Sequence, residues 1–321
     1  MRSECSFVLL LLTALTACAL TTTAATEAVP RTIDGRPDLD GYWDFGIATP
    51  LERPDEIIGR ASFTAAEVRA IERVGLFRFL QSGQNLKLAS PDNVTDYEAS
   101  IPRRVGPDRR TSLIIDPPYG RIPNLTPAAR ARESARSLRQ LNEPYADPEA
   151  LTAIERCIAW NAGPPPLIPA PYNNFVKIVQ TRDALMIASE MIHDARVIPL
   201  DNRPHLTASI RQWKGDSVGR WDGDTLVIDT TGFNEQTSLL GSGPAMHVVE
   251  RLTRLPGDDM RYEFTVDDPE SFTRKWTAAW MWKTTRGPLL EYACHEGNYS
   301  IVGILRGARQ GEREGATATP K

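Results

Sequence analysis

The chain has 321 residues, of which 41% are hydrophobic and 24% charged. This composition is typical of a globular protein, and the length allows one large domain or two smaller ones. The formal net charge of -4 gives no electrostatic basis for binding nucleic acid, so we expect no nucleic-acid partner. Four cysteines in a chain of this length exclude a disulfide-rich miniprotein, and no CxxC pair suggests a zinc finger.

The N-terminus has the pattern of an export signal over residues 1–17, in which Arg2 precedes an apolar run. That run of about 12 residues is shorter than the roughly 20 that a membrane span requires. Residues 15–18 (LTAC) also match a bacterial lipobox, in which Cys18 is lipidated; ordinary cleavage a few residues later is the alternative. We therefore expect a periplasmic protein attached to the outer membrane through Cys18, with no other membrane contact.

Two cysteines remain for the folded protein. Cys5 is removed with the signal and Cys18 carries the lipid, which leaves Cys157 and Cys294. The compartment is oxidising, so we predict a disulfide between them. Two free, buried thiols are the alternative, because free cysteine is among the most buried residue types.

The part of the chain before the expected sheet is predicted to be helical and irregular, over residues 18–110. A helix is predicted from Thr64 to Gly75, since Thr64 is a suitable N-cap and Glu67 follows three residues later. The next domain is predicted over residues 111–305. It begins with a strand at 112–116 and contains a helical insertion at about 126–156. The tail, 306–321, lacks apolar residues and is expected to be disordered.

Short strands with turn signals between them follow from residue 174 onward. A meander of about eight antiparallel strands leaves exposed edges, which closure into a barrel removes. The predicted fold is therefore mainly β: a lipocalin-like antiparallel barrel or a strongly curved sheet. The predicted strands cover residues 174–182, 184–192, 195–200, 224–231, 246–255, 259–267, 274–284 and 289–294.

Four aromatic residues are predicted to line a pocket for a small, partly apolar ligand inside the barrel. Trp276, Trp280 and Trp282 share one parity along their strand and point the same way. Tyr262 belongs to the neighbouring strand. Plain core packing is the alternative, because large aromatic residues commonly fill the interior of a sheet.

Residues 215–219 (GDSVG) match the GxSxG pattern of a hydrolase nucleophile elbow. The elbow requires a strand, a sharp turn and then a helix. Here residues 220–227 have the pattern of an Asp-Gly hairpin leading into a strand, so we do not predict a serine hydrolase. The chain also lacks a P-loop, a GxGxxG fingerprint and HExxH, and no cofactor is predicted.

All four histidines lie in the strand-rich part, where side chains from adjacent strands can converge. His193 next to Asp194, and His295 next to Glu296, are the acid–base candidates, since neutral imidazole exchanges protons near neutral pH. Consecutive strand residues face opposite sides, so pairing of histidines from different strands is favoured. No histidine pair has the spacing of a familiar metal motif, and no metal site is predicted. The third candidate is His247, and His205 is ranked last; structural roles remain the alternative for each.

Two segments, residues 189–200 (SEMIHDARVIPL) and 292–300 (YACHEGNYS), carry a family resemblance. Together with residues 31–43, 116–123 and 223–228, they resemble a family of exported proteins from acidobacteria and proteobacteria. The resemblance spans nearly the whole chain after the signal. It implies export and a single architectural unit, and it brings no activity with it.

The function predicted from these features is a periplasmic, lipid-anchored enzyme. It would be a lyase, isomerase or hydratase that uses histidine and carboxylate groups on a small-molecule substrate. Buried ionisable groups, which are costly to desolvate, favour this hypothesis over a purely apolar binding protein. A non-catalytic ligand-binding or envelope lipoprotein is the alternative, and a metal-dependent hydrolase is a weaker one.

Overall fold

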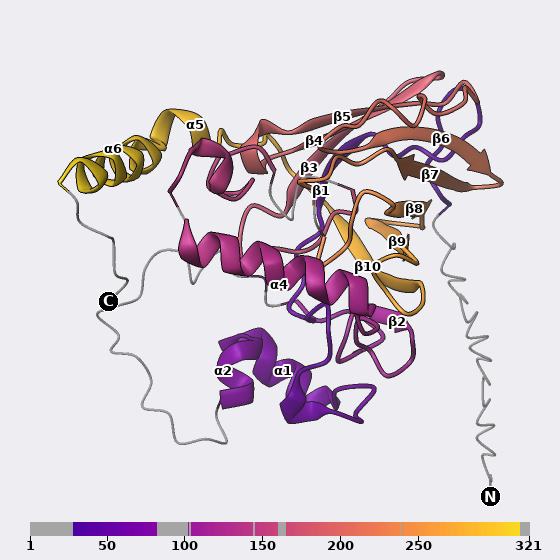
Figure 1. Cartoon of the computed structure of the whole chain (residues 1–321). Coiled ribbons are helices and arrows are strands. Elements are labelled where there is room, and N and C mark those ends of the chain that lie inside the picture. The colour runs from indigo at the N-terminus through magenta and orange to yellow at the C-terminus, as the bar shows by residue number, and fades with distance from the viewer. Residues whose placement is uncertain are drawn as a thin grey trace, which may run out of the picture.

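The computed structural model describes residues 28–81, 102, 104–143, 145–159, 165–237 and 239–314. In this part of the chain, ten antiparallel strands form one sheet, which curves around a hydrophobic core. Their order is β5-β4-β3-β1-β10-β9-β8-β7-β6, and β2 pairs with β10 beside this path (Figure 1). The strands are β1 (Gly41–Asp44), β2 (Ile114–Asp116), β3 (Phe175–Gln180), β4 (Ala184–Ser189), β5 (Ala195–Pro199), β6 (Asp216–Asp222), β7 (Thr225–Thr231), β8 (His247–Arg254), β9 (Asp259–Asp267) and β10 (Trp276–Thr285).

The two ends of this sheet approach each other without pairing. Strands β5 and β6 end the order, and no backbone ladder joins them. The side chains of Ile198 in β5 and of Leu200, which follows β5, lie against the backbone of β6: a Cβ placed on Gly219 would be 3.0 Å from Cγ2 of Ile198 and 2.6 Å from Cδ2 of Leu200. The predicted antiparallel β class is confirmed. Of the two predicted forms, a barrel or a strongly curved sheet, the closed barrel is wrong. Side-chain contact takes the place of backbone hydrogen bonds at the seam.

The sheet begins earlier in the chain than the sequence indicates. Strand β1, from the segment expected to be helical and irregular, lies between β3 and β10 near the centre of the sheet. Its Trp43 is buried and donates its indole N–H to the carbonyl of Leu39 at 3.0 Å. Strand β6 was also not predicted, and residues 289–294 form no strand. The β6–β7 hairpin turns at Gly223, whose φ is +60°, so the GDSVG segment is not a nucleophile elbow.

The cap predicted at Thr64 is present, and a second threonine caps the helical insertion. Thr64 caps α1 (Ala65–Val74) through the backbone of Glu67, and the Glu67 carboxylate accepts from the backbone N–H of Thr64, which completes a capping box. Thr126 caps α4 (Pro127–Asn142), with Pro127 in the first turn. In the described residues of the predicted helical insertion that follow α4, up to 156, the only helical element is the short 3-10 turn η3 (Pro148–Ala150). The remaining helical elements are η1 (Asp55–Ile57), α2 (Leu76–Gln81), η4 (Met191–His193), α5 (Cys294–Gly297) and α6 (Tyr299–Arg313).

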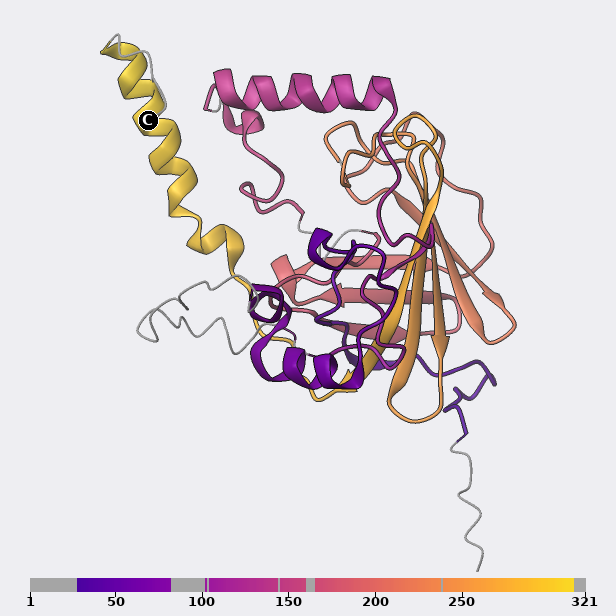
Figure 2. The same cartoon turned by 90° about the horizontal axis from the view of Figure 1, so that it is seen from below.

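The C-terminal segment is attached to the body by a disulfide. Cys157 and Cys294 are bonded, as predicted, and their Cα atoms lie 5.8 Å apart. The side-chain amide of Asn298 also donates to the carbonyl of Glu155 at 2.7 Å. Helix α6 follows and projects from the body (Figure 2), so the expectation of disorder from residue 306 is wrong up to residue 313. No helix in the described ranges combines the length and the apolar character needed to cross a membrane.

The interior of the curved sheet is filled by aromatic side chains. Tyr262 stacks on Trp282 with 4.6 Å between ring centroids and meets Trp280 edge-on at 5.0 Å. Trp276 packs edge-on against Phe264. All five are at most 5% exposed. The residues predicted to line a ligand pocket therefore pack against one another, which is the alternative stated above.

One ion pair crosses this interior. Arg196 of edge strand β5 contacts Glu250 of β8 through two hydrogen bonds of 2.5 and 3.0 Å. The hydroxyl of Tyr262 donates to the same carboxylate at 2.7 Å and accepts from the backbone N–H of Leu167 at 3.0 Å. Burial opposes the charge on Arg196, but the Glu250 carboxylate keeps the pKa of that guanidinium above its ordinary value. Burial, together with Glu250, raises the pKa of Tyr262 well above its usual range.

We predict that this pair is required for stability. Glu250→Gln removes the carboxylate charge and leaves Arg196 buried without its counter-ion, which costs about 3–5 kcal/mol in buried pairs. Tyr262→Phe leaves the charged pair in place and removes two hydrogen bonds, the one to Glu250 and the one from the backbone N–H of Leu167, at about 0.5–1.5 kcal/mol each. The measurement is the free energy of unfolding from denaturant titration.

The control is Asp222→Asn, because Asp222 forms an exposed pair with Arg251 at 3.1 Å. Exposed pairs contribute roughly 0–1 kcal/mol. A loss for Glu250→Gln no larger than that of the control would contradict the stabilising role of the buried pair.

Candidate functional site

His193 lies in a strained turn at the end of β4. Ile192 and His193 have φ values of +62° and +52°, which are unusual for residues other than glycine. The imidazole Nε2 of His193 accepts a hydrogen bond from the backbone N–H of Tyr292 at 3.1 Å. The Asp194 carboxylate instead forms an ion pair with Lys214. His193 and Asp194 therefore have separate partners.

His295 and Glu296 lie on the short helix α5, and both are exposed. Neither side chain makes a hydrogen bond or ion pair with a described residue. The backbone contact between Tyr292 and His193 brings the two motif segments together. No hydrogen bond joins His193 to His295 within the described ranges.

His247 is part of a hydrogen-bonded network at the start of β8. Its Nε2 lies 2.9 Å from Oδ2 of Asp229, and the other oxygen of Asp229 lies 2.9 Å from Nε2 of His205. The Nδ1 of His205 lies 2.9 Å from Oδ2 of Asp216. Four ionisable side chains thus form one chain, Asp216–His205–Asp229–His247, which we call the His–Asp relay.

The strand alternation explains how β6, β7 and β8 build the relay. Along β8, Val248 and Glu250 face the buried interior, which turns His247 to the outer face of the sheet. Asp229 lies on β7 in register with Val249 and is diagonal to His247. These outer positions are partly open: the side chains of His247 and Asp229 are each 39% exposed.

His205 comes from the connection between β5 and β6 rather than from a strand. The connection is fixed over β6 because the Asp216 carboxylate accepts from the backbone N–H of Leu206 at 3.1 Å. Asp216 is 6% exposed, and the Arg203 guanidinium lies 3.7 Å from its second oxygen. Both ring nitrogens of His205 therefore face carboxylates, one from β6 and one from β7.

The charges of the relay stabilise each other. The hydrogen bond and charge of Asp229 raise the pKa of His247 above its ordinary value, and the charge of Asp267 adds to this effect. In turn, the hydrogen bond from His247 is the largest factor that lowers the pKa of Asp229. Near neutral pH, Asp229 is therefore ionised, and His247 retains a proton to a higher pH than a free histidine.

This arrangement can accept and return protons at one ring nitrogen of the partly exposed His247 side chain. Asp229 holds the Nε2 side of His247, so Nδ1 is the nitrogen left for exchange; no described residue hydrogen-bonds to it. A carboxylate that orients an imidazole in this way fixes its tautomer and stabilises its charged form. In the described part of the chain, no three His, Cys, Asp or Glu side chains are grouped to hold a metal ion.

The relay differs from the sequence-based prediction in its members. His247 belongs to it, whereas His205, which was ranked last, lies at its centre, and Asp216 and Asp229 were not predicted. Asp229 is the only charged residue in a strand of apolar residues and threonines, and this pattern could have marked it as a candidate. His205 had none, since its place depends on the path of the β5–β6 connection.

The chain matches no model of a known protein family, and a search among curated proteins finds no matching relative. The chemistry of the relay is therefore argued from its geometry.

The pKa shifts predict the pH range in which the pair of Asp229 and His247 stabilises the fold. A raised histidine pKa stabilises the folded protein fully below about pH 6.5, the unfolded value, and this contribution is lost as pH rises through the folded pKa. The lowered pKa of Asp229 contributes above about pH 4, and this contribution is lost as pH falls. The destabilisation by Asp229→Asn should thus be largest between about pH 4 and 6.5 and smaller above it.

Nuclear magnetic resonance titration of the imidazole protons provides a direct measurement. The midpoint for His247 should fall in Asp229→Asn, while that of exposed His295 should not move. An unchanged His247 midpoint would contradict the assigned interaction.

Proposed function

We propose that the chain is an enzyme of the general acid–base type, with His247 as the group that exchanges protons with the substrate. The observation that carries this proposal is the unbroken series of 2.9 Å contacts from Asp216 through His205 and Asp229 to His247. A positioned imidazole contributes roughly 10²–10⁴ in rate when it transfers a proton in the transition state.

The reaction class follows from the groups that the relay contains and those it lacks. It has bases and acids but no hydroxyl or thiol among its four members. Ser217, the serine of GDSVG, is buried and hydrogen-bonded to Thr230 at 2.9 Å. Proton transfer, as in a lyase, isomerase or hydratase, is therefore favoured over attack by a protein nucleophile.

In the proposed step, Nδ1 of His247 takes a proton from a carbon of the substrate. The electron pair of the broken C–H bond moves into the substrate, and Asp229 stabilises the imidazolium that results. In an isomerisation, the same proton returns to a different carbon, which regenerates the neutral imidazole. The substrate would lie on the outer face of β7 and β8, where half-buried Val249 offers apolar contact.

The proposed location remains the periplasmic face of the outer membrane. Its basis is the LTAC segment ending at Cys18, which lies outside the described residues. We expect Cys18→Ser to release the protein from the membrane fraction and abolish labelling by a radioactive fatty acid. Membrane association of the wild type without label would contradict lipidation.

The catalytic proposal is tested by deuterium incorporation, which detects removal of a C–H proton whatever product the reaction forms. The protein is incubated in D₂O with a panel of 2-oxo, 2-hydroxy, 3-hydroxy and 2,3-unsaturated acids, and loss of proton signals is followed by nuclear magnetic resonance. We expect at least one panel member to exchange. His247→Gln and Asp229→Asn should slow that exchange about 10²-fold or more.

The matched control is His295→Gln, which removes an exposed imidazole outside the relay. It should exchange at the wild-type rate. Two outcomes would contradict the proposal: no exchange throughout the panel, or wild-type exchange in His247→Gln.

A further inference from the structure

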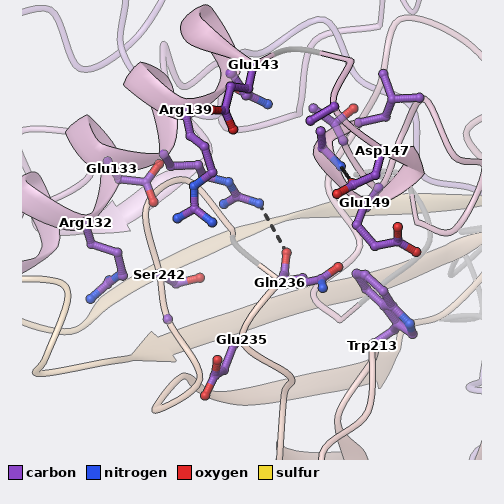
Figure 3. A pocket seen from close by; sticks show the side chains of 18 residues that line it. Arg132, Glu133, Arg139, Glu143, Asp147, Glu149, Trp213, Glu235, Gln236 and Ser242 are labelled. Atoms are coloured by element: carbon purple, nitrogen blue, oxygen red, sulfur yellow. Dashed lines mark hydrogen bonds between the residues drawn. The ribbon is translucent and has the colours of Figure 1, made fainter. Parts of the chain in front are cut away.

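A cavity of about 370 Å³ lies between α4, the turn at residues 146–153 and the loop at residues 235–243 (Figure 3). Small-molecule sites typically measure about 300–1,000 Å³. The cavity shares no lining residue with the His–Asp relay. The cavity is thus a different place on the molecule from the proposed catalytic site.

The α4 wall presents three arginines, Arg132, Arg136 and Arg139, whose spacing places them on one helix face. Arg132 donates to Oγ of Ser271 at 2.7 Å and so fixes the helix to the neighbouring loop. Arg136 makes one long bond of 3.3 Å to the carbonyl of Gln236. Arg139 has no acceptor among the described residues, and its side chain extends into the cavity in Figure 3. Guanidinium groups that have unused N–H donors are suited to binding a carboxylate.

The same cavity has carboxylates without partners. Glu133 lies on α4, Glu143 directly follows the end of that helix, and Glu235 lies on the opposite loop (Figure 3). None of the three forms an ion pair or a side-chain hydrogen bond within the described ranges. These carboxylates provide acceptors for an ammonium group or for hydroxyl donors.

The balance of charge decides what kind of ligand fits. Five carboxylates and three guanidinium groups line the cavity, but two of the carboxylates already have partners: Glu149 lies 3.8 Å from Arg156, and Asp147 accepts from the backbone N–H of Ala150 at 2.8 Å. The three other carboxylates then match the three guanidinium groups in number, and a purely anionic ligand would leave these carboxylates without a partner. A purely cationic ligand would be repelled by the positive charge of Arg139. A molecule with both signs can satisfy both sets. The carboxylates are Glu133, Glu143, Asp147, Glu149 and Glu235, and the guanidiniums are Arg132, Arg136 and Arg139.

The wall opposite α4 contains an aromatic ring. The half-buried indole of Trp213 lines the cavity, and the Arg156 guanidinium lies 5.8 Å from its ring centroid. Arg156 also donates to the side-chain oxygen of Gln236 at 3.4 Å, and this bond helps to hold the Arg156 guanidinium beside the indole. An aromatic ring positioned in this way offers a binding surface for a flat or apolar group.

We propose that this cavity binds a zwitterionic, peptide-like molecule of about dipeptide size with an apolar side chain. Its carboxylate contacts Arg139 and the remaining donors of Arg136. Its ammonium group lies toward Glu133 and Glu143, and its side chain packs on Trp213.

The test is isothermal titration calorimetry with three probes that differ only in terminal charge: Ala-Phe, N-acetyl-Ala-Phe and Ala-Phe amide. The wild type should bind Ala-Phe at least tenfold more tightly than either blocked form. Arg139→Gln should weaken Ala-Phe about tenfold and remove its advantage over the amide. Glu143→Gln should instead reduce its advantage over the acetylated form, and Trp213→Leu should weaken all three.

The control variant is Arg130→Gln, on the same helix but outside the cavity, where Arg130 donates to the carbonyl of Leu125. It should bind Ala-Phe as the wild type does. Folding of each variant is checked by circular dichroism, and Arg139→Gln should fold normally because Arg139 makes no described polar side-chain contact. The proposal is overturned if no probe binds at millimolar concentration, if the blocked forms bind as well as Ala-Phe, or if Arg130→Gln weakens binding as much as Arg139→Gln does.

Discussion

The buried pair of Arg196 and Glu250 connects the two ends of this curved sheet across its interior. Arg196 belongs to one edge strand, and Glu250 lies two strands from the other edge, so the pair crosses the interior. A flat sheet would separate these charges and leave each without its partner in an apolar setting. Because no ladder joins β5 to β6, side chains alone close this side of the fold.

This curvature also determines which face is available for chemistry. The inner face holds packed aromatic rings, with Tyr262 joining them to the charged pair. Polar groups that need solvent are consequently placed outside, as the alternation along β7 and β8 shows for Asp229 and His247. The connection from β5 to β6 carries His205 over this outer face and later supplies Trp213 to the cavity beside α4. A single connection thus contributes to both candidate sites.

Local signals in the sequence were sufficient for part of this structure. The capping box of Thr64 and Glu67 and the alternation over residues 259–267 depend on near neighbours, and both appear as predicted. The disulfide followed from having only two cysteines left in the folded part. By contrast, the four residues of β1 form a strand because β3 and β10, more than 130 residues away, provide its partners. A short segment cannot reveal such partners.

In the candidate sites too, some features follow from neighbouring residues, and others depend on residues far away in the sequence. Glu250 shares the parity of Val248 and Leu252, so its burial could have been predicted from alternation. That Arg196 would be its partner depends on the curvature. His205 and the cavity residues belong to connections whose paths are set by contacts with distant strands. Composition and spacing therefore identified His247 as a candidate but could not assemble the relay around it.

The placement of β1 gives the sheet an unusual covalent arrangement. The Cys157–Cys294 bond closes a ring that contains β3 to β10, and β1 enters the sheet from outside this ring, between β3 and β10. A chain shortened to begin after Asp44 would retain the ring but expose a gap with unpaired backbone groups on both sides. Such a gap can accept a strand from another molecule, as in donor-strand complementation. The N-terminal segment thus protects the sheet from intermolecular strand exchange.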